Sequence, residues 1–312
     1  MLKFGGPFPF TGPLATRENI AACARRVEAL GYDFVWIGDH LMFPKDLKSK
    51  YPLTPDGTLP IDPAHNFLEM FTTFAFLAGQ TTRLRFQTHV YLPALRHPLT
   101  SARLAASLDY LSGGRLNLVV GLGWMKDEYD VVGIPWSERG ARTDEAIQAM
   151  RAIFAEQAFK GRFYEVTEAW FRPRPVQDPL PIWVGGDSDA AIRRAARLGD
   201  GWAPTVPLGT ADPVGWMRGR VGHLRELMDA AGRSYAGFPI LQCVGFIGTA
   251  GGAYSLSDKK DALLGQIAAW KSVGCTHLAV LMNEQNSHEP LARTLEEAQW
   301  FAEEVMSESG RL

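Results

Sequence analysis

The feature that most constrains this chain is the regular alternation of short apolar runs with longer segments of helical periodicity. The apolar runs are predicted strands, and they span residues 2–6, 33–38, 84–92, 115–121, 181–185, 201–204, 240–248 and 276–282. A predicted helix follows each strand, at 16–30, 67–79, 99–111, 138–160, 189–198, 213–231, 260–273 and 291–306. The strands lack a strict polar–apolar alternation, as expected for strands that are covered on both faces. Repeated strand–helix units build a parallel sheet with its helices outside.

Eight such units in 312 residues predict an α/β fold of the (β/α)8 TIM-barrel type. The alternative, an open nucleotide-binding sheet, is expected to carry a glycine-rich turn after its first strand. Here Gly5 and Gly6 are followed by Pro7, which breaks that pattern. We therefore predict one domain over residues 1–312, with insertion loops at the C-terminal face of the barrel. Two irregular stretches, 42–63 and 162–180, are long enough to act as lids over a site.

Composition and charge exclude several classes of protein. The formal net charge is −2 and no long basic run occurs, which argues against nucleic-acid binding. The N-terminus lacks a signal-peptide pattern, and no apolar run is long enough for a membrane-spanning helix. Cys23, Cys243 and Cys275 are far apart, which excludes a disulfide framework and matches no metal-binding spacing. We expect a cytoplasmic protein without a metal centre or membrane contact.

The predicted helix at 67–79 is apolar on more than one face. Its phenylalanines, Phe67, Phe71, Phe74 and Phe76, do not form a single stripe. A helix on the outside of a barrel buries one stripe and exposes the opposite face to water. A second apolar face therefore indicates contact with another protein surface, and we expect a homodimer. The alternative is that an insertion of the same chain covers this face.

Active sites of (β/α)8 barrels lie at the C-terminal ends of the strands, so polar residues there are the candidates for chemistry. Asp39 and His40 follow the second strand, and a carboxylate beside an imidazole suits acid–base catalysis. A capping aspartate with a histidine packed on the barrel rim explains the pair equally well. Thr88 and His89 end the third strand, where one of them is expected to point into the barrel mouth.

Two glycine-containing segments are candidates for ligand binding. The first, at 121–124, has the sequence GLGW, in which the glycines permit close approach of a ligand and the tryptophan offers a flat apolar surface. The second, at 185–188, has the sequence GGDS and joins a late strand to a predicted helix. Free backbone N–H groups at a helix N-terminus bind phosphate, so this turn predicts a phosphate site. A plain strand–helix connection capped by its serine is the alternative.

Three segments together, 31–41, 97–147 and 181–204, resemble the bacterial luciferase-like oxidoreductases. The resemblance is strongest to the subgroup that uses coenzyme F420, a deazaflavin. It implies a dimeric barrel with the cofactor ring in its mouth, and hydride transfer between bound F420 and a small organic substrate. It also implies that Asp39 and His40 contact the cofactor and assist proton transfer, and that a non-proline cis peptide joins His89 to Val90.

On these grounds we expect His40 and Asp39 to be the catalytic residues, with Asp39 positioning His40. The residues expected to bind the cofactor are Asp39, Thr88, His89, Val90, Gly121, Trp124, Gly185, Gly186, Asp187 and Ser188. The aromatic residues expected to give an apolar substrate pocket are Trp36, Phe43, Trp124, Phe163, Tyr164 and Trp170.

One departure from the F420 pattern leaves the cofactor open. Some F420 dehydrogenases carry a glutamate directly after the glycine pair of the fourth strand, where this chain has Trp124, and Glu128 lies too far along to be given that role. The Gly–Trp pattern is shared by FMN-dependent monooxygenases. The first alternative is therefore a monooxygenase that uses O2 and reduced FMN, with a separate flavin or F420 reductase as a partner. The second is a non-catalytic flavin-binding barrel.

Overall fold

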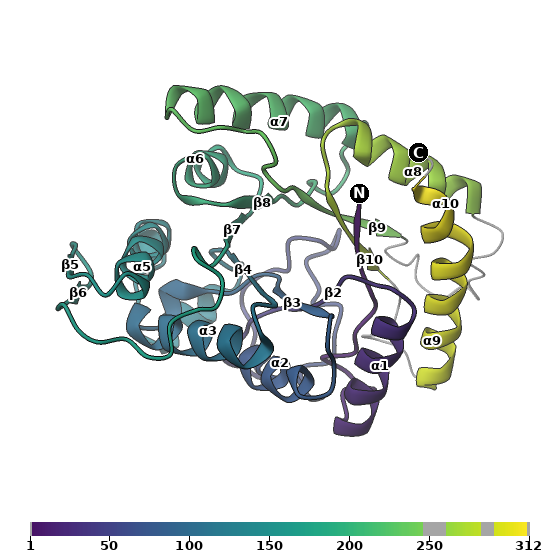
Figure 1. Ribbon diagram of the computed structural model, residues 1–312, viewed down its shortest axis with the longest axis horizontal. Coiled ribbons are helices and arrows are strands. Elements are labelled where there is room, and N and C mark those ends of the chain that lie inside the picture. The colour runs from purple at the N-terminus through teal and green to yellow at the C-terminus, as the bar shows by residue number, and fades with distance from the viewer. Residues whose placement is uncertain (1, 246–259, 282–289, 311–312) are drawn as a thin grey trace.

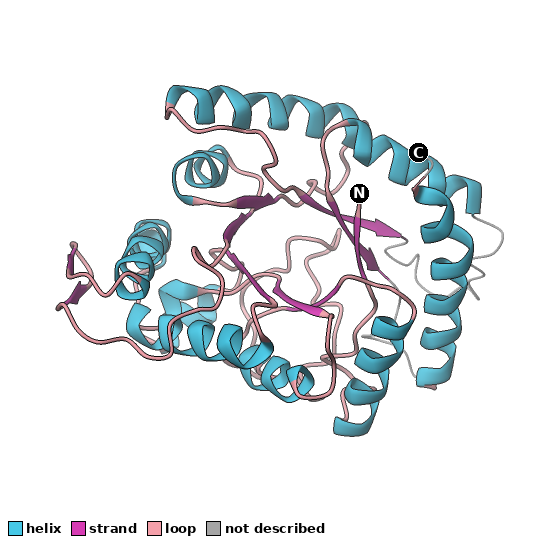
Figure 2. Cartoon of the chain, in the orientation of Figure 1, coloured by secondary structure: helices cyan, strands magenta, loops and turns pink. Residues whose placement is uncertain are grey.

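The computed structural model describes residues 2–245, 260–281 and 290–310 (Figure 1). Its parallel strands are β1 (Lys3–Gly5), β2 (Phe34–Ile37), β3 (Arg85–Thr88), β4 (Leu116–Val120), β7 (Ile182–Gly185), β8 (Gly201–Ala203), β9 (Leu241–Gly245) and β10 (His277–Leu281). They are hydrogen-bonded in the order β8-β7-β4-β3-β2-β1-β10-β9. A bridge between Trp202 and Ile240 joins the two ends of this sheet. The predicted (β/α)8 barrel is therefore confirmed, and Figure 2 shows its ring of strands enclosed by helices.

Helices that begin and end near their predicted limits cover the outside of the ring. They are α1 (Arg17–Ala29), α2 (Met70–Ala78), α3 (Pro98–Ser112), α5 (Arg139–Phe154), α6 (Asp189–Leu198), α7 (Pro213–Ala230), α8 (Lys260–Ser272) and α9 (Leu291–Trp300). A π-helix (Phe301–Met306) and the short α10 (Ser307–Ser309) continue α9. Side-chain caps fix several starts: Thr16 Oγ1 accepts the Asn19 N–H of α1 at 3.2 Å. A cap of this kind satisfies one of the unpaired amides of the first turn.

Three segments differ from the sequence prediction. The helix predicted at 138–160 ends at Phe154, because Glu156 takes a left-handed φ of 60° that a right-handed helix cannot continue. The residues beyond it form a hairpin of β5 (Phe159–Lys160) and β6 (Glu165–Val166) beside α5. A short helix, α4 (Lys126–Val131), and two 3-10 turns, η1 (Pro93–Leu95) and η2 (Trp136–Glu138), were not predicted. Residues 246–248 and 282 of two predicted strands lie outside the described residues.

The strands are covered on both faces, as their unbroken apolar sequences predicted. All residues of β4 and β7 are buried. One hydrophobic cluster fills the inside of the barrel and includes Phe34, Val119, Trp183, Ala203, Leu241 and Ala279. A larger cluster lies between the strands and the surrounding helices. The barrel interior is therefore packed, and a ligand has room only at the barrel ends.

The aromatic residues of the 67–79 segment are covered within the chain. Phe71 packs against Tyr91 and Phe74 against Phe86, each with ring centroids 5.2 Å apart. Phe67 contacts Phe43 of the 42–63 insertion at 5.2 Å. Contacts within the same chain thus account for the second apolar face of this helix. The homodimer stays a prediction, and this helix no longer supports it.

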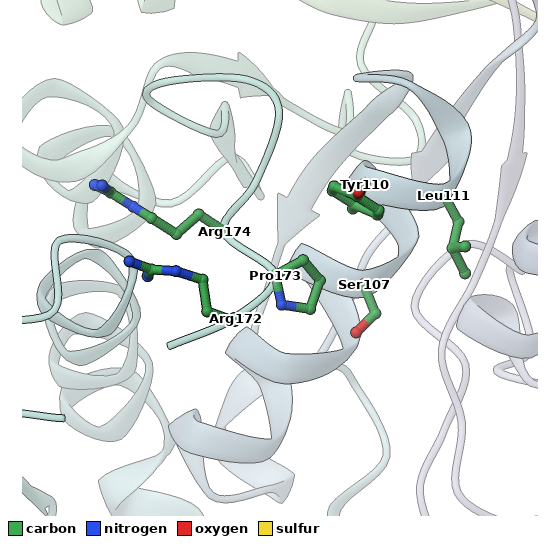
Figure 3. Close-up of a pocket in the computed structure, with 6 residues that line it drawn as sticks. All are labelled: Ser107, Tyr110, Leu111, Arg172, Pro173 and Arg174. Carbon is green, nitrogen blue, oxygen red and sulfur yellow. The ribbon is translucent and has the colours of Figure 1, made fainter. Parts of the chain in front are cut away.

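Exposed apolar side chains lie instead on α3. Leu104, Tyr110 and Leu111 are 37%, 59% and 67% exposed. Ser107, Tyr110 and Leu111 of α3 line an open groove of about 880 Å³ together with the segment 172–174 (Figure 3). This groove lies at the C-terminal half of α3, and barrel helices run antiparallel to the strands, so it is distant from the mouth where chemistry is expected. No described helix is long and apolar enough to cross a membrane.

Candidate functional site

The carboxylate of Asp39, just beyond β2, binds an arginine rather than His40. The two guanidinium Nη atoms of Arg96 donate to its two oxygens at 2.7 and 2.8 Å, and the Leu92 N–H donates at 3.0 Å. The Asp39 side chain is only 2% exposed. The Asp39–Arg96 pair therefore connects the loop after β2 to the loop after β3. The hydrogen-bond partners of Asp39 are thus not those expected for a residue that positions His40.

His40 is held by a residue that the sequence did not assign. Its Nδ1 lies 2.8 Å from Oε2 of Glu128, on α4, and the Leu41 N–H donates to the other oxygen of that carboxylate at 2.5 Å. Glu128 is 1% exposed at its side chain and His40 is 14% exposed. Among the described residues, no hydrogen bond reaches His40 Nε2. The imidazole thus has one nitrogen fixed by a buried carboxylate and one open to a ligand.

Aromatic rings surround the imidazole of His40. The ring centroids of Phe43, Phe67 and Trp124 lie 4.7, 5.4 and 5.7 Å from its own. Tyr51 of the 42–63 insertion packs edge-on against Trp124 at 5.2 Å. Two of the expected pocket residues, Phe43 and Trp124, therefore do form an apolar wall at the barrel mouth.

The other expected aromatic residues lie elsewhere. Trp36 sits in the barrel, edge-on to Phe10 at 5.6 Å and to His89 at 5.8 Å. Tyr164 packs against His97 at 5.7 Å. The guanidinium of Arg142 covers the Phe163 ring at 4.4 Å, and Trp170 is 84% exposed.

The 42–63 insertion is fastened over the mouth by α4. The carboxylate of Asp127 accepts the N–H groups of Lys48 and Ser49 at 3.2 and 3.1 Å and the Ser49 hydroxyl at 2.5 Å. Burial raises the pKa of Tyr51, and the Cys243 thiol on β9 adds to the effect.

The peptide bond between His89 and Val90 is cis, as the resemblance implied. The pairing of β3 with β4 ends at Gln87 and resumes where Tyr91 bridges Val120, so His89 and Val90 lie in a bulge between the two strands. The Thr88 hydroxyl donates to the Val119 carbonyl oxygen and accepts the Val119 N–H, both at 2.7 Å. That hydroxyl is therefore occupied by the sheet and is not free for a cofactor.

The side chain of Val90 explains two of the expected glycines. A Cβ on Gly121 would lie 2.4 Å from Val90 Cγ2, and one on Gly185 would lie 2.6 Å from Val90 Cγ1. Real Cβ atoms do not come so close to other carbons. Glycine at these two positions lets the bulge pack onto the ends of β4 and β7, a structural requirement that exists without any ligand.

The turn after β7 has the geometry of an anion site. Gly186 has a φ of 103°, which favours glycine, and its N–H donates to the Ala203 carbonyl oxygen at 3.1 Å. Ser188 Oγ caps α6 by accepting the Ala191 N–H at 3.2 Å. Among the described residues, no acceptor takes the N–H groups of residues 188–190, which open the helix. These amides therefore remain available to a phosphate.

Arg220 on α7 adds a positive charge beside this turn. Its guanidinium donates to the Asp187 carbonyl oxygen and to Asp189 Oδ1, the latter at 2.8 Å. The sequence did not single out Arg220, because it lies 33 residues beyond Asp187 and on another helix. The cation offsets part of the negative charge of the two aspartates, which on its own would disfavour a phosphate.

Two partly buried histidines, His89 and His277, predict that the free energy of unfolding falls in mild acid. Burial lowers the pKa of His89 and of His277 from 6.5 to about 4. Between those values the unfolded chain binds protons that the folded chain does not, so the free energy of unfolding decreases as the pH falls and is greatest above about 6.5. We expect a decrease of about 2 kcal/mol per histidine between about pH 7 and about pH 5. Urea unfolding at both pH values measures it, and an equal decrease in the wild type and a His277→Asn variant would contradict the assignment.

Comparison with known proteins gives the family. A family model described as luciferase-like monooxygenase matches residues 4–301. An uncharacterized protein of Mycobacterium tuberculosis is 37% identical over 246 residues, which cover 78% of this chain and 83% of that protein. The FMNH2-dependent dimethylsulfone monooxygenase of Pseudomonas putida is 34% identical over 143 residues, 44% of this chain and 39% of that protein. The F420-dependent glucose-6-phosphate dehydrogenase of Amycolatopsis mediterranei is 31% identical over 199 residues, 60% of this chain and 53% of that protein.

A solved structure agrees with the observed architecture. An F420-dependent secondary alcohol dehydrogenase, in complex with an F420–acetone adduct, superposes with a TM-score of 0.73 over 98% of each chain at 15% identity. This likeness concerns the fold, since the sequences have diverged so far. From the match of the family model over residues 4–301, together with the barrel, we conclude that the chain belongs to the luciferase-like monooxygenase family.

Proposed function

We propose that this protein transfers hydride between bound coenzyme F420 and a small, apolar organic substrate, with His40 as the proton donor or acceptor. The observation that carries the proposal is the imidazole of His40, held at Nδ1 and open at Nε2 within a wall of aromatic rings. An acid–base group must lie within hydrogen-bond reach of the proton that it moves, and an open nitrogen at the barrel mouth meets that condition.

The residues present fit a phosphate-bearing flavin or deazaflavin. The amides of residues 188–190 and the nearby Arg220 can bind the phosphate, and the aromatic mouth can accept a flat ring. When bound, such a group supplies the hydride chemistry, while the protein supplies binding, orientation and exclusion of water. His40 exchanges the proton of the substrate oxygen. Phe43, Phe67 and Trp124 keep water from the reacting atoms and favour an uncharged substrate.

Binding titrations of F420 and FMN against cofactor-free protein test the choice of cofactor. We expect micromolar binding of F420 and weaker binding of FMN. A Ser188→Asp variant keeps the cap but places a carboxylate beside the phosphate, and should weaken binding about 10-fold or more. Ser188→Asn is the matched control, since it caps the helix without the charge. Equal losses in the two variants, or no binding of either cofactor, would contradict the phosphate site.

An FMN-dependent monooxygenase is the second candidate, and Trp124 favours it. This residue stands where some F420 dehydrogenases have a glutamate, and one relative at 34% identity is an FMNH2-dependent monooxygenase. In that case a separate reductase would supply the reduced FMN. Substrate-dependent O2 consumption with reduced FMN, and none with reduced F420, would favour this candidate over hydride transfer to F420.

A further inference from the structure

We propose that Glu128 is a positioning residue: its carboxylate holds His40 in the tautomer that carries hydrogen on Nδ1, and thereby keeps Nε2 free for the reacting group. The use of that nitrogen in catalysis rests on the proposed function. The tautomer itself is a property of the folded protein and does not depend on any cofactor.

The contacts of Glu128 define which nitrogen carries the hydrogen. An ionised carboxylate only accepts hydrogen bonds, so a contact of 2.8 Å between Oε2 and His40 Nδ1 requires an N–H on that nitrogen. The other oxygen already accepts the Leu41 N–H. A carboxylate that is 1% exposed and receives two donors is satisfied as the anion. Neutral His40 therefore presents a lone pair at Nε2, and protonated His40 presents a second N–H there.

The short helix α4 fixes Glu128 in place. The neighbouring Tyr129 is fully buried, its hydroxyl donates to the Leu122 carbonyl oxygen at 2.7 Å, and its ring packs edge-on against Trp136 at 5.2 Å. Asp127, on the other side of Glu128, is fastened to the 42–63 insertion and not to His40. The two adjacent carboxylates of α4 thus serve different segments, and Asp127 provides a control for changes to Glu128.

This arrangement determines which nitrogen of His40 exchanges a proton with the substrate. A bound deazaflavin would supply the hydride acceptor for oxidation of an alcohol; as the O–H bond of the alcohol breaks and the carbonyl forms, Nε2 of His40 would take the proton. The resulting imidazolium has one N–H on the Glu128 carboxylate and one toward the product oxygen. In the reverse direction Nε2–H returns the proton to the oxygen. A base oriented by a carboxylate is a recurrent arrangement for such transfers.

NMR of 15N-histidine-labelled, cofactor-free protein at mildly alkaline pH tests the tautomer. A His40→Asn variant identifies the His40 signals among those of the seven histidines. We expect the wild type to show one tautomer, with hydrogen on Nδ1. In Glu128→Gln the amide can donate or accept, so the Nε2–H tautomer should become populated, whereas Asp127→Asn should leave the wild-type pattern unchanged. A wild-type His40 with hydrogen on Nε2 would overturn the proposal, as would an unchanged tautomer in Glu128→Gln.

Kinetics provide the second measurement. We expect Glu128→Gln to lower kcat about 10- to 100-fold, a part of what a positioned acid–base group contributes, with the cofactor Kd unchanged. Asp127→Asn should act on KM more than on kcat, because it loosens the insertion. An unchanged kcat in Glu128→Gln would show that the tautomer is not used. If no substrate is turned over at all, the proposed function fails, and the NMR result still decides the role of Glu128 in holding His40.

Discussion

Replacement of His40 by alanine is expected to lower kcat by about 10²- to 10⁴-fold while the cofactor Kd stays nearly the same. The imidazole is the group at the aromatic mouth with an open nitrogen, and its removal leaves the buried Glu128 without a route to the substrate. The phosphate turn and Arg220 lie on β7, α6 and α7, so cofactor binding should survive. Turnover is measured from the absorbance change of F420 with a panel of ketones and secondary alcohols.

His65→Ala is the control for this variant. His65 belongs to the same side of the barrel, and its side chain is 39% exposed. We expect its replacement to leave both kcat and Kd unchanged. If His40→Ala binds and turns over like the wild type, acid–base catalysis by His40 is excluded. Tight cofactor binding without turnover in the wild type would instead favour the non-catalytic flavin-binding barrel.

Replacement of Arg96 by methionine is expected to lower the free energy of unfolding by about 3–5 kcal/mol. The reason is that the Asp39 carboxylate, whose side chain is 2% exposed, would lose both of its guanidinium hydrogen bonds. Among the residues that the structure describes, the Leu92 N–H would be the one donor left to this carboxylate. Methionine fills a similar volume, so the loss reports the unpaired charge more than lost packing. Urea unfolding near neutral pH measures the change.

A double variant separates charge from packing. Asp39→Asn with Arg96→Met removes the uncompensated charge, and we expect it to recover a large part of the lost stability. Lys126→Met, which breaks the exposed pair with Asp130, is the matched control and should change stability little. A loss in Arg96→Met as small as in this control would show that the Asp39–Arg96 pair behaves as a surface pair, and that it does not fix the loop that carries His40.

One residue of the mouth departs from the F420 pattern that the resemblance implied. Some F420 dehydrogenases are expected to place a glutamate directly after the fourth strand, where this chain has Trp124. The structure brings the carboxylate of Glu128 to His40 from a short helix further along the chain. Trp124 and Glu128 can therefore both contact His40, because they approach the imidazole from different positions in the chain.

The sequence by itself determined the architecture. Strand and helix periodicity predicted eight strand–helix units. Helix α6 begins and ends at the predicted residues, and Ser188 caps its first turn. Periodicity is a local property, so it can be read without knowing the fold. The cis peptide at His89–Val90 was predicted from the resemblance, because no periodicity in the sequence indicates such a bond.

The contacts of the candidate site were decided only by the tertiary structure. His40 and Glu128 are 88 residues apart, and Asp39 and Arg96 are 57 residues apart. The adjacent residues Asp39 and His40 thus bind partners in two different segments, the loop after η1 and the helix α4, and no local pattern distinguishes their roles. The closure of the barrel brings those segments together, and the number of residues between them along the chain does not indicate which of their side chains then meet. The physical reason is that a hydrogen bond depends on distance in space, whereas a sequence pattern records distance along the chain.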